Sequence, residues 1–186
     1  MEPPKTLDDV RAAKGVFPAD EIEPGDAVLD LMCAGFYGAN AAIHVIDRKP
    51  SRYVGVDIDA VKLKAMQDIY PSDVCQFRRE LAEQSLASVR DPIGPDVTIC
   101  DPWTQGIAEW MPRLWALSIV TRRVVILGTC DSWLKAHRLE PTPEGLTAWA
   151  CRETVRNPIS IGRPRTCTRV IRRSDHLGGT FWTVWR

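Results

Sequence analysis

The chain has 186 residues, of which 45% are hydrophobic and 26% charged, a composition that suits one globular domain. Its 24 basic and 24 acidic residues cancel, so no net field draws the whole molecule to nucleic acid or to an anionic membrane. No apolar stretch approaches the roughly 20 residues that span a bilayer, and the first residues lack the apolar run of a signal peptide, so we expect a soluble cytoplasmic protein.

An acidic, proline-rich extension, residues 1–24, precedes a single domain predicted over residues 25–186. Within the extension, LDDVRAAK predicts a short helix. In the domain, compact apolar runs that suit buried strands alternate with segments whose apolar residues have helical spacing. These predict strands at 27–33, 52–59, 74–80, 96–103 and 123–130, and helices at 39–48, 60–70, 106–123 and 143–157. Residues 167–186 predict two more strands joined by a turn at Gly178-Gly179.

This order of elements predicts a doubly wound, Rossmann-like α/β fold. A mostly parallel sheet carries helices on both faces and ends in a C-terminal antiparallel hairpin. In such open sheets, ligands bind beyond the carboxyl ends of the strands, where the strand order reverses. The residues that follow each strand are therefore the candidates for a site.

Three strand ends carry residues suited to a nucleotide-like ligand. Asp30 closes the first strand, and the tight turn after it lets backbone amides approach a ligand. Asp57 closes the second strand, where a carboxylate can accept both hydroxyls of a ribose, whereas Asp59 better fits a helix N-cap. Asp101 follows the fourth strand and can accept a hydrogen bond from an amine, and Trp103 offers a flat face for stacking.

The segments VLDLMCAGFYGA, YVGVDID and ICDPW, in this order and spacing, resemble the class I S-adenosylmethionine-dependent methyltransferases over about residues 25–130. The final hairpin suits the antiparallel sheet edge of that family. DPW resembles the (D/N)PP(Y/F/W) motif of its amino-methyltransferases, whose main targets are nitrogens of adenine, cytosine, guanine or glutamine. The resemblance implies S-adenosyl-L-methionine as the cofactor and methyl transfer to a nitrogen as the reaction.

The resemblance also implies roles for individual residues. Those implied to bind the cofactor are Asp30, Met32, Ala34, Gly35, Asp57, Ile58 and Glu80. Glu80 would hold the adenine amino group, with Gln84 as the alternative. Those implied to be catalytic are Asp101, Pro102 and Trp103. The Asp101 carboxylate and the Pro102 carbonyl would accept the hydrogens of the amine, and Trp103 would stack on a flipped-out base.

Two features depart from the family pattern. The family usually places glycines two, four and six residues after its acid, but this chain has Met32, Ala34 and Phe36 there and glycines at 35 and 38. The second departure is a single proline after Asp101 where the family usually has two. Both departures favour an alternative reading, a methyltransferase-like module that binds or assembles without catalysis.

The C-terminal segment, residues 151–186, holds eight arginines and two acids, which predicts a surface that faces a polyanion. Arg169, Arg172 and Arg173 are the candidates for phosphate contacts. Strand alternation places Arg169 and Arg173 on one face and Arg172 on the other. We expect nucleic acid as a partner and no membrane. Because no second domain for reading sequence is evident, we also consider a partner subunit or a second copy of the chain.

The expected function is therefore S-adenosylmethionine-dependent N-methylation of an exocyclic amine of a nucleobase in DNA or RNA. Besides the module without catalysis, two alternatives remain. A small-molecule methyltransferase would be supported by a general base such as His137. An NAD-dependent Rossmann enzyme is disfavoured by the absence of GxGxxG and by the terminal hairpin. No metal is expected, because the six cysteines form no CxxC pair and the three histidines lack ligand spacing.

Overall fold

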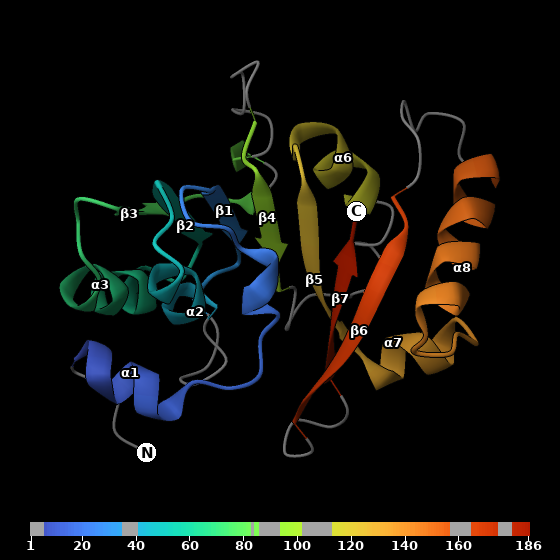
Figure 1. Cartoon of the computed structure of the whole chain (residues 1–186), viewed down its shortest axis with the longest axis horizontal. Coiled ribbons are helices and arrows are strands. Elements are labelled where there is room, and N and C mark those ends of the chain that lie inside the picture. The colour runs from blue at the N-terminus through green and yellow to red at the C-terminus, as the bar shows by residue number, and fades with distance from the viewer. Residues whose placement is uncertain are drawn as a thin grey trace.

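A computed structural model describes residues 6–34, 41–82, 84–85, 94–101, 113–156, 165–174 and 180–186, and it is built on a seven-stranded sheet (Figure 1). The strands lie in the order β3-β2-β1-β4-β5-β7-β6. The first five are parallel, whereas β7 runs antiparallel to both of its neighbours. Their bounds are β1 Ala27–Leu31, β2 Arg52–Asp57, β3 Cys75–Arg79, β4 Val97–Cys100, β5 Val124–Cys130, β6 Cys167–Ser174 and β7 Thr180–Trp185. The predicted Rossmann-like fold with a C-terminal antiparallel pair is confirmed.

Helices cover both faces of the sheet, and each face has its own hydrophobic core. One face, which we call the α2 face, carries α1 (Leu7–Ala13), α2 (Ala42–Asp47) and α3 (Ala60–Ile69). The other, the α8 face, carries α6 (Arg113–Val120), α7 (Asp131–Ala136) and α8 (Pro143–Arg156). In Figure 1 the first group gathers at one end of the sheet, and α7 and α8 lie at the other end.

Local sequence signals explain where several elements begin and end. Asp59 caps α3, because its Oδ1 accepts hydrogen bonds from the backbone N–H groups of Val61 and Lys62, as predicted for this residue. The strand predicted at 27–33 is two residues longer than β1, which ends at Leu31. Met32 has a φ of 62°, in the left-handed region, which ends β1 at Leu31. Helix α7 is an element that the sequence analysis did not single out.

The segment between α1 and β1, residues 14–26, crosses the α2 face toward the hairpin of β6 and β7, and we call it the N-terminal strap. The backbone oxygen of Val16 accepts a 2.8 Å hydrogen bond from Nε1 of Trp182. The ring of Phe17 meets that indole edge-on, with centroids 5.2 Å apart, and stacks on His44. The strap therefore covers the part of this face that lies over β7.

A buried carboxylate fastens the strap to the hairpin. Glu21, in the short 3-10 helix η1 (Ala19–Glu21), is only 3% exposed. Its Oε1 accepts a 3.0 Å hydrogen bond from Arg169 of β6, and its Oε2 accepts a 2.6 Å bond from Arg186. Because a buried charge is tolerated when it is paired, these two contacts hold Glu21 in place.

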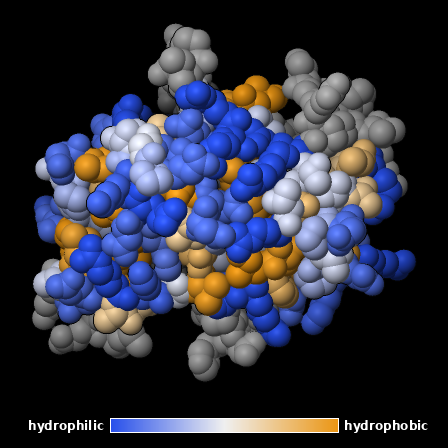
Figure 2. Space-filling view, in the orientation of Figure 1, coloured by the Kyte–Doolittle hydropathy of each residue, from blue (hydrophilic) through white to orange (hydrophobic). Residues whose placement is uncertain are grey.

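The surface in view is dominated by hydrophilic residues, with separate smaller hydrophobic areas between them (Figure 2). In the part of the chain that the structure describes, every helix is too short or too polar to cross a membrane.

We predict that Glu21→Ala lowers the free energy of unfolding by about 2 kcal/mol, because two charge-assisted hydrogen bonds are lost. Equilibrium denaturation with urea measures this change. The matched control is Glu23→Ala, which removes the 3.2 Å ion pair of an exposed carboxylate with Arg123 and should change stability by less than about 0.5 kcal/mol. Equal effects of the two substitutions would contradict the role given to Glu21.

Candidate functional site

The strand order reverses between β1 and β4, and three carboxyl groups meet at the carboxyl edge of the sheet beside that point. Asp30 lies in β1 opposite Gly55 of β2 and Ile99 of β4. Asp57 is the last residue of β2, and Asp101 directly follows β4. Strand alternation directs all three side chains to the α2 face. The charges of Asp57 and Asp101 each raise the pKa of Asp30, so the three groups lie within electrostatic reach of one another.

Asp30 is the most deeply buried of the three acids. It is 2% exposed, and its Oδ2 accepts a 2.6 Å hydrogen bond from the hydroxyl of Tyr53. Burial raises the pKa of Asp30 to about 8, which the Tyr53 hydrogen bond opposes and the nearby carboxylates reinforce. The carboxyl group is therefore mostly protonated at neutral pH.

Asp57 connects the end of β2 to the turn that follows β1. Its Oδ2 accepts a 3.0 Å hydrogen bond from the backbone N–H of Ala34, and its Oδ1 accepts one of 2.9 Å from the backbone N–H of Asp59. A carboxylate has about four lone-pair sites, so acceptor capacity remains for two further donors. The predicted cofactor residues Asp57 and Ala34 are thus brought together.

The same turn shows how the chain manages without a glycine at position 32. Met32 keeps the left-handed backbone, with a φ of 62°, that a glycine would adopt freely. For a residue with a side chain this conformation costs of order 1–2 kcal/mol. The backbone at Met32 therefore keeps the left-handed conformation typical of glycine, although the sequence departs from the family pattern at this position. Gly35, another predicted cofactor residue, lies outside the described residues.

Glu80 follows β3 beside Asp57, and its backbone N–H donates to the Asp57 carbonyl oxygen at 3.1 Å. Its Oε1 is buried and has no hydrogen-bond partner among the described residues. Buried polar atoms are usually paired, so this oxygen is suited to a donor supplied by a ligand. Two large apolar side chains next to these acids are exposed to solvent, Ile58 at 52% and Leu81 at 49%. Leu81 was missed from the sequence, although an apolar residue directly after a strand end was its signal.

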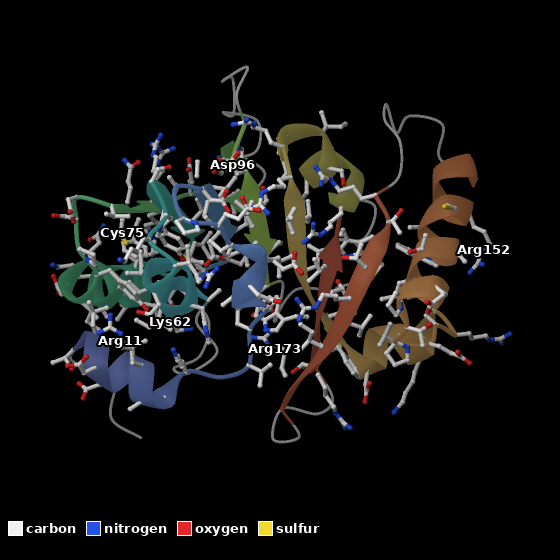
Figure 3. All side chains as sticks on the ribbon, in the orientation of Figure 1. Arg11, Lys62, Cys75, Asp96, Arg152 and Arg173 are labelled. Atoms are coloured by element: carbon white, nitrogen blue, oxygen red, sulfur yellow. The ribbon has the colours of Figure 1, made fainter. Side chains whose placement is uncertain are left out.

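Asp101 forms a largely buried ion pair with Arg173 of β6, in which the carboxylate side chain is 14% exposed. Nη1 of Arg173 donates to both carboxylate oxygens, at 2.9 and 2.8 Å, and the arginine side chain is only 5% exposed. Figure 3 places Arg173 near the middle of the molecule, beside the strap and the hairpin. Burial raises the pKa of Asp101 above its usual value, and the charge and hydrogen bonds of Arg173 oppose that rise without cancelling it. Pro102 and Trp103, the other predicted catalytic residues, lie outside the described residues.

The structure shows which groups of this chain the arginines of β6 contact. Arg169 and Arg173 do share one face of the strand, but both guanidinium groups bind carboxylates of this chain. Arg169 contacts Asp20 and Glu21, and Arg173 contacts Asp101. The phosphate contacts predicted for these arginines stay predictions, and in this structure the buried guanidinium of Arg173 pairs with a carboxylate of the same chain. Arg172 has an exposed side chain.

Comparison with known proteins shows the fold. No protein-family model matches the chain, and no curated protein matches its sequence. Among solved structures, magnesium protoporphyrin IX methyltransferase ChlM of Synechocystis PCC 6803, with bound SAM, has a TM-score of 0.59 and 14% identity over 96% of this chain and 76% of its own. Aeropyrum pernix fibrillarin with bound S-adenosyl-L-methionine has a TM-score of 0.57 and 14% identity over 98% and 75%. The B. subtilis M1A22 tRNA methyltransferase TrmK has a TM-score of 0.55 and 11% identity over 96% and 64%. This chain has the Rossmann-like fold of these methyltransferases.

We predict that Asp30 makes the protein less stable as the pH rises. The pKa of about 8 in the folded state lies above the ordinary value of 3.8, so stability that is fully present below pH 4 is lost as the pH rises toward 8. The loss amounts to at most about 1.4 kcal/mol per pH unit. Asp30→Asn should flatten this dependence in denaturation measured from pH 4 to 8. The exposed-site control Asp68→Asn should follow the wild type. An unchanged pH dependence in Asp30→Asn would contradict the prediction.

Proposed function

We propose that this protein is an S-adenosylmethionine-dependent N-methyltransferase that acts on an exocyclic amine of a nucleobase in RNA or DNA. The observation that carries the proposal is the meeting of Asp30, Asp57 and Asp101 at one edge of a methyltransferase-type sheet. Each acid lies at or next to the end of a different strand, and each has a chemically distinct environment.

The residues at the edge fit S-adenosylmethionine as the cofactor. Asp57 has acceptor capacity for the two ribose hydroxyls, and the unpartnered Oε1 of Glu80 suits the adenine amino group. The exposed side chains of Ile58 and Leu81 offer apolar surface for the adenine ring. The carboxylate of Asp57 lies at the same edge and favours a cation, which the cofactor carries at its sulfonium.

The cofactor supplies a methyl group on a positively charged sulfur, which leaves as a neutral thioether. The chain has to hold the acceptor amine in line, which lowers the barrier by positioning. Asp101 can accept hydrogens from that amine, so that the nitrogen lone pair is less delocalised into the ring. The amine proton then leaves to water. A carboxylate at this point disfavours an acidic acceptor by like-charge repulsion.

A nucleobase acceptor is supported by the DPW segment and by the likeness to a tRNA methyltransferase. The exposed Arg172 on β6 could contact a phosphate. A small-molecule acceptor is the second candidate. The internal pairing of Arg169 and Arg173 favours it, because fewer arginines of the tail then face a polyanion. The likeness to a methyltransferase named for magnesium protoporphyrin IX agrees with this candidate.

We predict that the protein binds S-adenosylhomocysteine and that Asp57→Ala weakens binding by about a hundredfold or more, because two charge-assisted hydrogen bonds to the ribose are lost. Isothermal titration calorimetry measures both affinities. Glu80→Gln should weaken binding by about tenfold, and Asp68→Asn on the exposed side of α3 should leave it unchanged. If the wild type binds NAD and not S-adenosylhomocysteine, the assignment of the cofactor is wrong.

Methyl transfer should depend on Asp101. We expect the wild type to transfer tritiated methyl groups from S-adenosylmethionine to tRNA, single-stranded DNA or duplex DNA. Asp101→Ala should reduce the rate about a hundredfold or more while S-adenosylhomocysteine still binds. Because that substitution leaves Arg173 without its carboxylate, Asp101→Ala combined with Arg173→Met provides a second variant without a lone buried charge. Cofactor binding without transfer to any of these nucleic acids would contradict a nucleobase acceptor.

A further inference from the structure

Asp101 is held by an ion pair that crosses part of the sheet. The carboxylate itself follows β4, and its partner Arg173 comes from β6, the far edge of the same sheet. Strands β5 and β7 lie between them in the strand order. The pair therefore spans the whole hairpin side of the sheet.

Gly128 of β5 leaves the space that this arrangement requires. A Cβ atom built on Gly128 would lie 2.1 Å from Oδ1 of Asp101, which is too close for any side chain. Gly128 lies opposite Trp182 in the β5–β7 register, so the open space is on the face that carries the indole. The Asp101 carboxylate thus turns over β5 toward Arg173.

Trp182 supports the guanidinium of Arg173. The central carbon of the guanidinium lies 3.9 Å from the centroid of the indole ring, a cation–π contact that is strong when it is shielded from water. The indole is fixed in turn by its hydrogen bond to Val16 and by the ring of Phe17. Arg173 is therefore positioned by packing as well as by its carboxylate.

Arg173 is also the cation that faces a group of acidic side chains. Asp30 from β1 and Asp57 from β2 face the same edge, with the phenol of Tyr53 and the thiol of Cys33 beside them. On β6 itself, Arg169 is engaged with Glu21 of the strap. Without Arg173, burial would favour a protonated Asp101.

We propose that Arg173 is the positioning residue for methyl transfer, which aims Asp101 and favours its ionised form so that both carboxylate oxygens can accept hydrogens of the acceptor amine. This inference rests on the proposed function. Nη1 of Arg173 takes one lone-pair site on each oxygen, which leaves further sites for the amine. A protonated Asp101 would present a donor to the amine in place of an acceptor.

The direct test needs no acceptor substrate. The carboxyl carbon of Asp101 is followed by 13C NMR through a pH titration of the full chain, with S-adenosylhomocysteine present, and is assigned with Asp101→Asn. Asp30→Asn and Asp57→Asn assign the two neighbouring carboxyl groups, so that their titrations are not mistaken for that of Asp101. In Arg173→Gln, Asp101 should titrate about one to three pH units higher than in the wild type. Arg173→Lys, which keeps the charge, should restore most of the difference.

A control separates this effect from the general loss of an arginine ion pair. Arg186→Gln removes a contact to Glu21 from the other strand of the hairpin and should leave the titration of Asp101 unchanged. Calorimetry with S-adenosylhomocysteine shows that each variant is folded. If Arg173→Gln fails that check, the comparison is made with Arg173→Lys and with Gly128→Ala, whose added methyl group displaces the carboxylate from the guanidinium.

The pH dependence of methyl transfer is the second readout, measured with the nucleic acid that the wild type methylates. At pH 7 the rate of Arg173→Gln should be at least about tenfold lower, and it should recover at higher pH as Asp101 ionises. A merely structural role would lower the rate equally at all pH values. If Asp101 titrates at the same pH in Arg173→Gln and in the wild type, the inference is overturned. If the titration shifts but the wild type transfers no methyl group to nucleic acid, only the proposed function is overturned.

Discussion

Several carboxyl groups, one of them fully buried, have to be accommodated at one edge of the sheet, and much of the structure follows from this constraint. Asp30 avoids the cost of a buried charge by staying protonated with a hydrogen bond from Tyr53. Asp57 accepts hydrogen bonds from two backbone N–H groups, and Asp101 pairs with the guanidinium of Arg173. Three acids at neighbouring strand ends thus reach three different electrostatic states, which is the condition for giving them different tasks in one site.

The ion pair between Arg173 and Asp101 connects this edge of the sheet to segments near both ends of the chain. Arg173 reaches Asp101 because the terminal hairpin lies beside β5, and the hairpin is held by the N-terminal strap through Glu21 and Trp182. The strap and the hairpin are far apart in the sequence and contribute no residue of the motifs that resemble the methyltransferases. They nevertheless supply and hold the guanidinium that lowers the pKa of the acid that follows β4.

In the turn after β1, the sequence departs from the family pattern while the backbone keeps a conformation typical of glycine. Met32 adopts the left-handed backbone that a glycine would adopt at lower cost. The hydrogen bond from Ala34 to Asp57 and the bond from the Cys33 N–H to the Val56 carbonyl oxygen hold the turn against that strain. Strained residues of this kind persist where the surrounding structure determines the backbone, and such positions cluster at functional sites.

The sequence by itself determined the strands, most of the helices, their order along the chain and the strand ends near which Asp30, Asp57 and Asp101 stand. Periodicity and caps are local signals, so Asp59 could be recognised as the cap of α3 and the apolar runs as buried strands. The partners of the arginines, the burial of Glu21 and the exposure of Leu81 were decided only by the tertiary structure. Arg173 and Asp101 are 72 residues apart, and irregular pairing between β6 and β7 sets where Arg173 stands along the strand. No local pattern encodes such a register, because it is fixed by how the hairpin packs against β5 and the strap.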